Sequence, residues 1–159
     1  MATKRRFFSL DKRDLFENYG IPLEAIHICD KFYNLYTERW FYESYAGKLR
    51  GYFRKLKQVD WKGKWIYVTD SNDCEDAAIG GRAFASSYNR KSAKGTTNGI
   101  PVGVFFYTSE QWGRHAILCA LLRKGKYHNS KRLYFMEPIL RRRLNLTIKE
   151  VESCTLCLI

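Results

Sequence analysis

Apolar residues recur at three-and-four spacing along the first half of the chain, a pattern typical of amphipathic helices. The spacing predicts a short helix over residues 9–19 that stops at Gly20. It also predicts a long helix over residues 38–57 that Thr37 can cap. A third stripe, made of small and apolar side chains, begins at Cys74 and predicts another helix there.

Three apolar runs bounded by turn residues follow Ile100, and such runs are typical of β-strands. The predicted strands cover residues 101–107, 115–122 and 132–136, and their short connections predict an antiparallel meander. Extended pieces are also predicted at residues 26–29, 65–68 and 154–159, and a capping box at Thr147 predicts a last short helix. Helices followed by a curved antiparallel sheet predict an α+β fold, with the Cys74 helix packed on the sheet.

The chain has 159 residues, which is enough for one domain with a full apolar core. We predict a single domain over residues 1–159, with a helical part over 1–64 and a helix-and-sheet core over 65–159. No apolar run is long enough for a signal peptide or a membrane span, so we expect a cytoplasmic protein.

The cysteines are odd in number and irregularly spaced, which is typical of reduced thiols rather than a disulfide framework. They are Cys29, Cys74, Cys119, Cys154 and Cys157. Cys154 and Cys157, with His27 and Cys29, have a spacing that suggests zinc. Within a strand, however, the two later sulfurs point to opposite faces, so we expect no metal and no cofactor.

The net charge is +12, and a basic surface suits nucleic acid or an acidic protein partner. The basic residues form two clusters, one along the long helix and one at residues 141–143. If the clusters share a face, they can hold phosphates; the alternative is a solvated surface. The candidate anion-binding residues are Arg54, Lys55, Lys57, Arg141, Arg142 and Arg143.

Cys74 is the candidate nucleophile, because backbone N–H groups at a helix start favour a thiolate. Asp73, Glu75 and Asp76 oppose that effect by their charge and are expected to cap the helix. A nucleophilic thiol needs a base, and His115 stands at the start of a predicted strand. Glu137 ends the next strand, where it can lie beside His115. The alternative for Cys74 is an inert buried cysteine.

Four short motifs in this order resemble the papain-like cysteine fold in its transglutaminase-like form. They are Asp73-Cys74-Glu75-Asp76-Ala77-Ala78, Gly99-Ile100-Pro101-Val102, His115-Ala116 and Tyr134-Phe135-Met136-Glu137-Pro138. The pattern is also similar to peptidase domains of the fungal agglutinin type and to small phage-encoded proteins. The resemblance implies a Cys74 nucleophile, a His115 general base and acid, and a Glu137 that orients His115. Asn72, Asp76 and Tyr67 are candidates for oxyanion or site support.

These observations predict a cysteine hydrolase, of peptidase or amidase type, that acts on a protein or peptide substrate through a Cys-His-Glu triad and an acyl-enzyme. One alternative is an inactive basic protein that binds nucleic acid or an acidic protein, phage-encoded and directed at a host cytoplasm. A second is acyl transfer of the transglutaminase type. The sequence leaves the substrate, the second oxyanion donor and the oligomeric state open.

Overall fold

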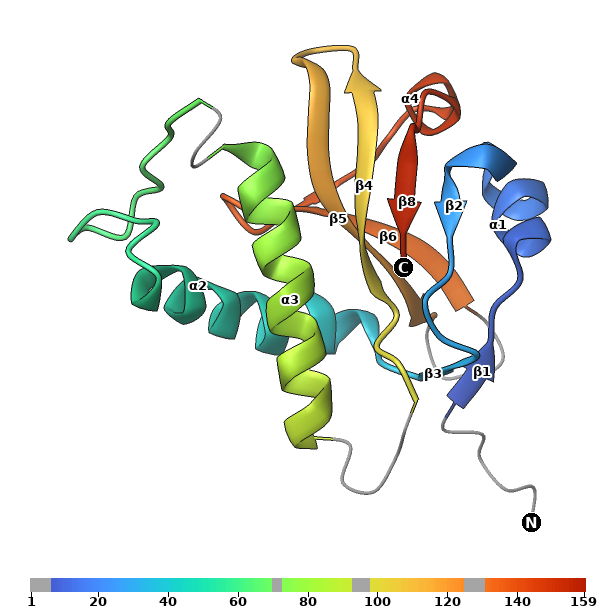
Figure 1. The fold of residues 1–159 in the computed structure, drawn as a ribbon, viewed down its shortest axis with the longest axis horizontal. Coiled ribbons are helices and arrows are strands. Elements are labelled where there is room, and N and C mark those ends of the chain that lie inside the picture. The colour runs from blue at the N-terminus through green and yellow to red at the C-terminus, as the bar shows by residue number, and fades with distance from the viewer. Residues whose placement is uncertain (1–6, 70–72, 93–97, 125–130) are drawn as a thin grey trace.

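The computed structural model describes residues 7–69, 73–92, 98–124 and 131–159. Figure 1 shows the helices and strands arranged around a central sheet. In chain order they are β1 (Phe7–Ser9), α1 (Lys12–Tyr19), a 3-10 turn (Leu23–Ala25), β2 (Ile26–His27), β3 (Phe32–Asn34), a π-helical segment (Trp40–Tyr45), α2 (Ala46–Lys55), α3 (Cys74–Ser92), β4 (Val102–Ser109), β5 (Gly113–Arg123), β6 (Lys131–Glu137), β7 (Arg142–Leu144), α4 (Ile148–Glu152) and β8 (Leu156–Leu158).

The central sheet has six strands in the order β2-β8-β4-β5-β6-β7, and β1 pairs with β3 in a separate two-stranded sheet. The pairs of the central sheet are antiparallel except β2 and β8, which run parallel. Gly103 is required in β4 because a Cβ atom there would overlap the backbone of Leu158 and Ile159. The last strand therefore lies inside the sheet, between β2 and β4.

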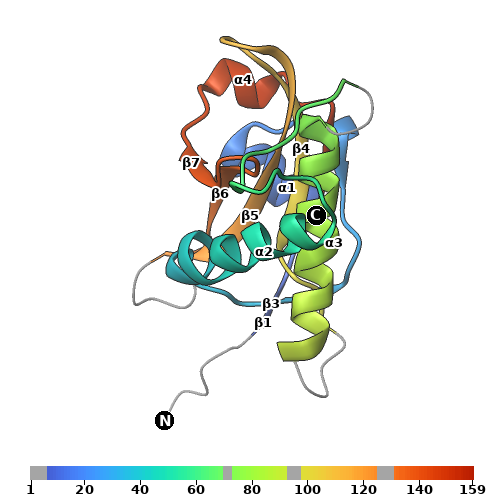
Figure 2. The same ribbon diagram turned by 90° about the vertical axis from the view of Figure 1, so that its left-hand side faces the viewer.

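Small residues let α3 lie close against one face of the sheet (Figure 2). Ala77, Ala78 and Ala85 of α3 are fully buried, and a Cβ atom on Gly81 would lie only 2.8 Å from Leu118 of β5. Tyr45 strengthens this contact, because its hydroxyl donates a 2.6 Å hydrogen bond to the carbonyl of Gly81. This packing fixes the start of α3, and with it Cys74, over the ends of the sheet strands.

The two faces of the sheet have separate apolar cores, as strand alternation requires. Ile117 and Phe135 pack on the side of α1 and α4, with Leu15 and Val151. The alternate strand positions pack on the side of α2 and α3; they include Leu118, Ala120, Tyr134 and Met136, which lie with Phe53 and Ala77. None of the helices in the described part of the chain is long and apolar enough to cross a bilayer.

The predicted arrangement of N-terminal helices followed by an antiparallel sheet is wrong in two respects. Residues 1–64 were expected to be helical apart from an extended piece at residues 26–29; β2 confirms that piece, but β1 and β3 were not predicted. The sheet is mixed rather than antiparallel, because β2 joins the far end of the chain in parallel. Two-residue and three-residue strands carry too few residues for periodicity to identify them, so their partners decide their conformation.

Most of the longer elements agree with their predicted positions. The helices at residues 9–19 and 38–57 exist as α1 and as the π-helical segment continued by α2, and the strands after Ile100 exist as β4, β5 and β6. The capping box of Thr147 and Glu150 is also confirmed. Residues 65–68, by contrast, form no strand; Trp65 makes a single bridge with Val59.

Candidate functional site

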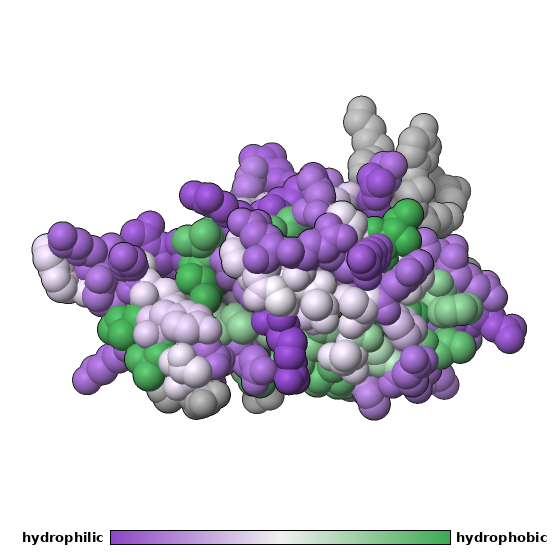
Figure 3. All heavy atoms as spheres, turned by 90° about the horizontal axis from the view of Figure 1, so that it is seen from above, coloured by the Kyte–Doolittle hydropathy of each residue, from purple (hydrophilic) through white to green (hydrophobic). Residues whose placement is uncertain are grey.

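A pocket of about 380 Å³ lies between the start of α3, the start of β5 and the turn after β6. It is lined by Tyr67, Cys74, Trp112, Arg114, His115, Glu137, Ile139 and Leu140. Seen from above, the molecule is largely hydrophilic, and apolar residues form separate patches (Figure 3). The pocket has an apolar rim within this surface, since Trp112, Tyr67 and Leu140 are each more than half exposed.

Cys74 is the first residue of α3, and the acids beside it hold the helix start. The carboxylate of Asp73 accepts the backbone N–H of Glu75 at 3.0 Å, and the carboxylate of Asp76 accepts that of Asp73 at 3.1 Å. The expectation that these acids cap the helix is confirmed for Asp73 and Asp76. Asp76 thus supports the Cys74 turn from outside the pocket lining.

The surroundings of Cys74 favour the protonated thiol. Burial raises the pKa of the Cys74 thiol, and the charges of Asp73 and Glu75 raise it further. The backbone N–H of Ala116 donates to the sulfur and opposes this rise in pKa. The sequence indicated the opposing charges of the acids, whereas the largest influence in the structure is desolvation, which outweighs the hydrogen bond from Ala116.

His115 is half-buried on β5, opposite Tyr107 of β4. Its ring centroid lies 5.9 Å from that of Tyr107 and 5.3 Å from that of Trp112. Nε2 is buried and has no hydrogen-bond partner among the described residues. Burial lowers the pKa of His115, which favours the neutral ring.

Glu137 is buried at the end of β6, where it holds the following turn. Its carboxylate accepts the backbone N–H of Leu140 at 2.6 Å and that of Ile139 at 3.2 Å. Burial raises the pKa of Glu137, while these two hydrogen bonds and the charges of nearby arginines oppose the rise. Among the described residues its carboxylate has no hydrogen bond to His115, so the role implied for it there stays a prediction.

Cys74, His115 and Glu137 line one pocket without hydrogen bonds to one another, and strand alternation explains why. His115 and Glu137 have the strand parity of Ile117 and Phe135, which face α1 and α4, whereas Cys74 comes from α3 on the other face. The pocket lies at the strand ends, where both sides reach it. The structure thus brings Cys74, His115, Glu137 and Tyr67 together, while Asn72 lies outside the described residues.

Four lining residues were missed by sequence reasoning. Trp112 and Arg114 lie at the β4–β5 turn, and Ile139 and Leu140 lie in the turn after β6. The one available signal is Trp112, an aromatic residue next to Gly113 in a polar turn. Because the polar groups of such a turn stay hydrated, its tryptophan is expected to remain exposed. The apolar pair of Ile139 and Leu140 has no periodic pattern that marks it.

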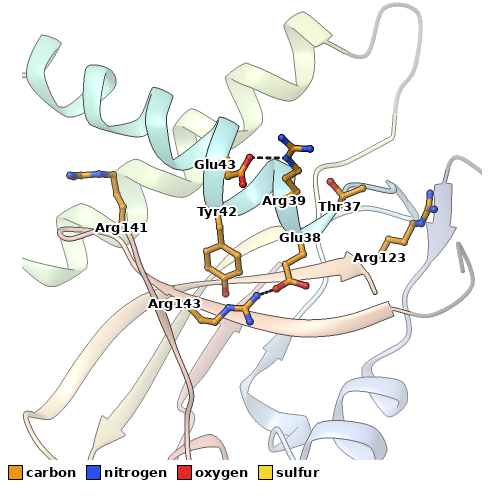
Figure 4. A pocket seen from close by; sticks show the side chains of 8 residues that line it. All are labelled: Thr37, Glu38, Arg39, Tyr42, Glu43, Arg123, Arg141 and Arg143. Carbon is orange, nitrogen blue, oxygen red and sulfur yellow. Dashed lines mark hydrogen bonds and ion pairs between the residues drawn. The ribbon is translucent and has the colours of Figure 1, made fainter. Parts of the chain in front are cut away.

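A second cavity, of about 710 Å³, lies between the π-helical segment and the ends of β5 and β7 (Figure 4). Its lining includes four arginines and two glutamates: Arg39, Arg123, Arg141, Arg143, Glu38 and Glu43. Arg143 forms an ion pair with Glu38, and its guanidinium lies 4.6 Å from the ring centre of Tyr42. Arg39 pairs with Glu43 at 2.9 Å.

The predicted anion-binding residues divide between the two basic clusters of the sequence. Arg54, Lys55 and Lys57 are exposed at the end of α2 and just after it. Arg143 is taken up by its pair with Glu38, whereas Arg141 forms no ion pair among the described residues. The metal alternative finds no support, since the described residues contain no group of three His, Cys, Asp or Glu placed to hold an ion.

No protein-family model and no curated protein matches this chain. Its likeness is to solved structures. The PSL1a-E64 complex superposes with a TM-score of 0.69 at 14% identity, over 98% of this chain and 52% of that one. The Polyporus squamosus lectin bound to the human-type influenza-binding epitope Neu5Aca2-6Galb1-4GlcNAc superposes with a TM-score of 0.64 at 13% identity, over 98% and 50%. The chain therefore spans about half of each neighbour, and the likeness concerns the fold.

These neighbours correct the family prediction. They are named as a lectin and as PSL1a, not as a papain-like peptidase or a transglutaminase. The papain-like fold name, the cysteine hydrolase with its acyl-enzyme, and transglutaminase-type transfer are overturned with it. The physical weakness was that four short motifs at helix and strand ends describe local turns, whereas a triad needs hydrogen bonds between its members.

The predicted partners are corrected for the same reason. The ligand named for the lectin is a glycan, not a protein or peptide substrate, a nucleic acid or an acidic protein. The idea of an inactive basic protein was nearer in predicting binding without catalysis, but it named the wrong classes of ligand. Net charge alone does not distinguish one anionic or polar partner from another.

Proposed function

We propose that this chain is a binding domain whose ligand occupies the Cys74 pocket, where the thiol of Cys74 and the imidazole of His115 are the reactive groups. One observation carries the proposal. A thiol, an unpaired imidazole nitrogen and a carboxylate, from α3, β5 and β6, line one pocket of about 380 Å³. Concave sites with an apolar lining and a few convergent polar groups are typical ligand sites.

The rim suits a ligand with an apolar part. Tyr67 is 61% exposed and Trp112 is 55% exposed, although both are large aromatic side chains. Trp112 lies within ring contact of His115, so a ligand that reaches the imidazole also meets the indole. A ligand whose electrophilic carbon carries a displaceable oxygen can then bond to the Cys74 sulfur: the C–S bond forms, the C–O bond breaks, and the thiol proton passes by way of the His115 nitrogen to that oxygen.

E64 tests the proposal because its epoxide alkylates thiols. Ring opening forms one C–S bond and breaks one C–O bond, and the new alkoxide takes up the thiol proton. We expect a single adduct on Cys74, located by mass spectrometry. The adduct should be absent in Cys74→Ala and should form several-fold more slowly in His115→Ala.

Cys29 provides the internal control, because it is exposed and lies outside the pocket. Iodoacetamide, which needs no pocket, should modify Cys29 readily. Cys119, Cys154 and Cys157 are buried and should stay unmodified in the folded protein. Equal rates of E64 addition at Cys29 and Cys74 would refute a ligand site around Cys74.

Carbohydrate recognition at the same pocket is a second candidate, and the glycan named for the lectin neighbour favours it. Exposed aromatic rings beside polar groups offer both an apolar surface and hydrogen-bond partners to a sugar. Here Trp112 and Tyr67 supply the rings, and Arg114 with His115 supplies the polar groups.

The trisaccharide Neu5Aca2-6Galb1-4GlcNAc tests this candidate when titrated against tryptophan fluorescence. Binding here predicts saturable quenching that is lost in Trp112→Ala and kept in Trp61→Ala, since Trp61 is an exposed tryptophan outside the pocket. Absence of binding would refute the candidate.

A further inference from the structure

Three arginines come together beside the loop that follows α2. A Cβ atom on Gly63 would lie 3.2 Å from Nη2 of Arg50 and 3.3 Å from Nη2 of Arg54, so both guanidinium groups lie against this glycine. Arg141 comes from the turn between β6 and β7; burial lowers the pKa of its guanidinium, and the nearby charge of Arg50 lowers it further. The two basic clusters of the sequence therefore meet in space.

The backbone conformation of Arg141 is unusual for a non-glycine residue. Its backbone is left-handed, with a φ of 56°, a conformation that few side chains adopt without a stabilising contact. In Figure 4 the side chain of Arg143 points to Glu38, whereas the side chain of Arg141 points away from Glu38. Arg141 is half-buried, and its Nη1 donates a 3.0 Å hydrogen bond to the carbonyl of Ile139.

None of the three guanidinium groups forms an ion pair in the described part of the chain, although the charge of Glu137 acts on Arg141. The ion pairs found there use Arg13, Arg39 and Arg143. Asp60, the acid next to Gly63, uses Oδ1 to accept the backbone N–H groups of Lys62 and Lys64. Glu137, the acid that faces Arg141, is held by its own turn.

We infer that Arg50, Arg54 and Arg141 form a binding site for a doubly charged oxyanion, the phosphate or sulfate ester group of a small ligand. The carboxylate of Glu137 offsets only part of the repulsion among these three like charges, and a bound dianion would offset the rest. Guanidinium groups also match the oxygens of phosphate and sulfate through paired N–H donors. The site is separate from the Cys74 pocket and does not depend on the function proposed there.

Titration calorimetry with inorganic phosphate and inorganic sulfate tests the site, with potassium chloride holding the ionic strength constant. We expect saturable binding of both dianions, weakened about tenfold in Arg141→Gln, Arg50→Gln or Arg54→Gln, as the loss of one charge-assisted contact predicts. A sugar phosphate and a sulfated sugar, titrated in parallel, distinguish the two ester classes. Whichever binds more tightly than its inorganic ion identifies the ligand group.

Arg13→Gln is the matched control, because it removes the same charge from an exposed arginine on α1. It should leave the affinity within twofold of the starting protein. Arg141→Lys keeps the positive charge but loses the paired N–H donors of the guanidinium. Its affinity for the dianion should therefore lie between those of the starting protein and Arg141→Gln. The inference fails if phosphate binds no better than chloride, or if Arg13→Gln and Arg141→Gln weaken binding equally.

The stability of Arg141→Gln separates an anion site from a structural role. Without added dianion, the variant should unfold at the same temperature as the starting protein or higher, because repulsion from Arg50 is gone. With phosphate present, only the starting protein should gain stability. A variant that is clearly less stable in both conditions would show that Arg141 stabilises the turn between β6 and β7, and would overturn the inference.

Discussion

The charge and burial around Cys74 set the rate at which its thiol reacts. The thiolate is the reactive form, and burial with the charges of Asp73 and Glu75 raises the thiol pKa. Alkylation of Cys74 should therefore quicken about tenfold for each pH unit from 6 to 8, as the thiolate fraction grows. A flat rate over this range would instead indicate a thiolate–imidazolium pair with His115.

Glu75→Gln should speed this alkylation a few-fold at pH 7, because it removes a nearby negative charge and lowers the thiol pKa. Glu75 is exposed, so the change should leave α3 intact. Glu24→Gln removes an exposed charge from outside the pocket and serves as the control for the measurement, made by quenched labelling and mass spectrometry. Equal rates in both variants would contradict the electrostatic account of Cys74.

Single residues were also where sequence reasoning reached its limit at the site. Cys74 and Glu137 could be proposed from their places at the ends of a helix and a strand. The lack of a partner for His115 Nε2 could not, since it depends on which face each strand end presents. Ile139 and Leu140 have no pattern of their own, and they line the pocket with Trp112 only because two turns distant in the sequence meet there.

At the scale of the element, two glycines on neighbouring helices should respond oppositely to the same substitution. Gly81 on α3 faces Leu118 and the Tyr45 hydroxyl, so Gly81→Ala overfills the contact and should cost about 1–3 kcal/mol. Gly51 on α2 has open space around its Cβ position, so Gly51→Ala should gain about 0.5–1 kcal/mol through helix propensity.

Urea unfolding followed by circular dichroism measures both free energies. Gly47→Ala, also on α2 with open space around it, repeats the Gly51 test at a second position. If Gly81→Ala proved as stabilising as Gly51→Ala, α3 would not lie as close to β5 as described.

The longer elements were predictable from their own residues, and so were the extended pieces at residues 26–29 and 154–159, but the parallel pairing between those two pieces was not. The apolar runs of β4, β5 and β6 follow from composition and turn residues. Ile26 and His27 form a strand only because Cys157 and Leu158 lie beside them. The start of the long helix winds as a π-helix at Trp40–Tyr45, which a 3.6-residue period does not foresee.

For the molecule as a whole, the net charge of +12 makes stability depend on salt. Mutual repulsion of exposed cations destabilises the compact state, and added salt screens it. The melting temperature should rise as potassium chloride increases from about 20 to about 200 mM, a range over which the screening length shortens severalfold. Calorimetry measures the rise, and a fall in melting temperature over that range would show that favourable ion pairs outweigh the repulsion.

The predictions about the whole molecule had different outcomes. The sequence raised the condition that the two basic clusters share a face; the charge of Arg50 acts on Arg141, while Arg143 of the same cluster pairs with Glu38. The partner class inferred from charge was wrong, because charge does not specify shape. The single domain over residues 1–159 and the cytoplasmic location stay predictions.

The position of β8 has a consequence for how the chain is made. A ribosome releases residues from the amino end first, yet residues 26 and 27 pair with residues 157 and 158. While residues 156–158 are still inside the exit tunnel, β2 has no neighbour and one edge of β4 stays open. The newly made chain must therefore keep that edge from pairing with other chains until residues 156–158 have left the exit tunnel, so chaperones that cover exposed strand edges should help its expression.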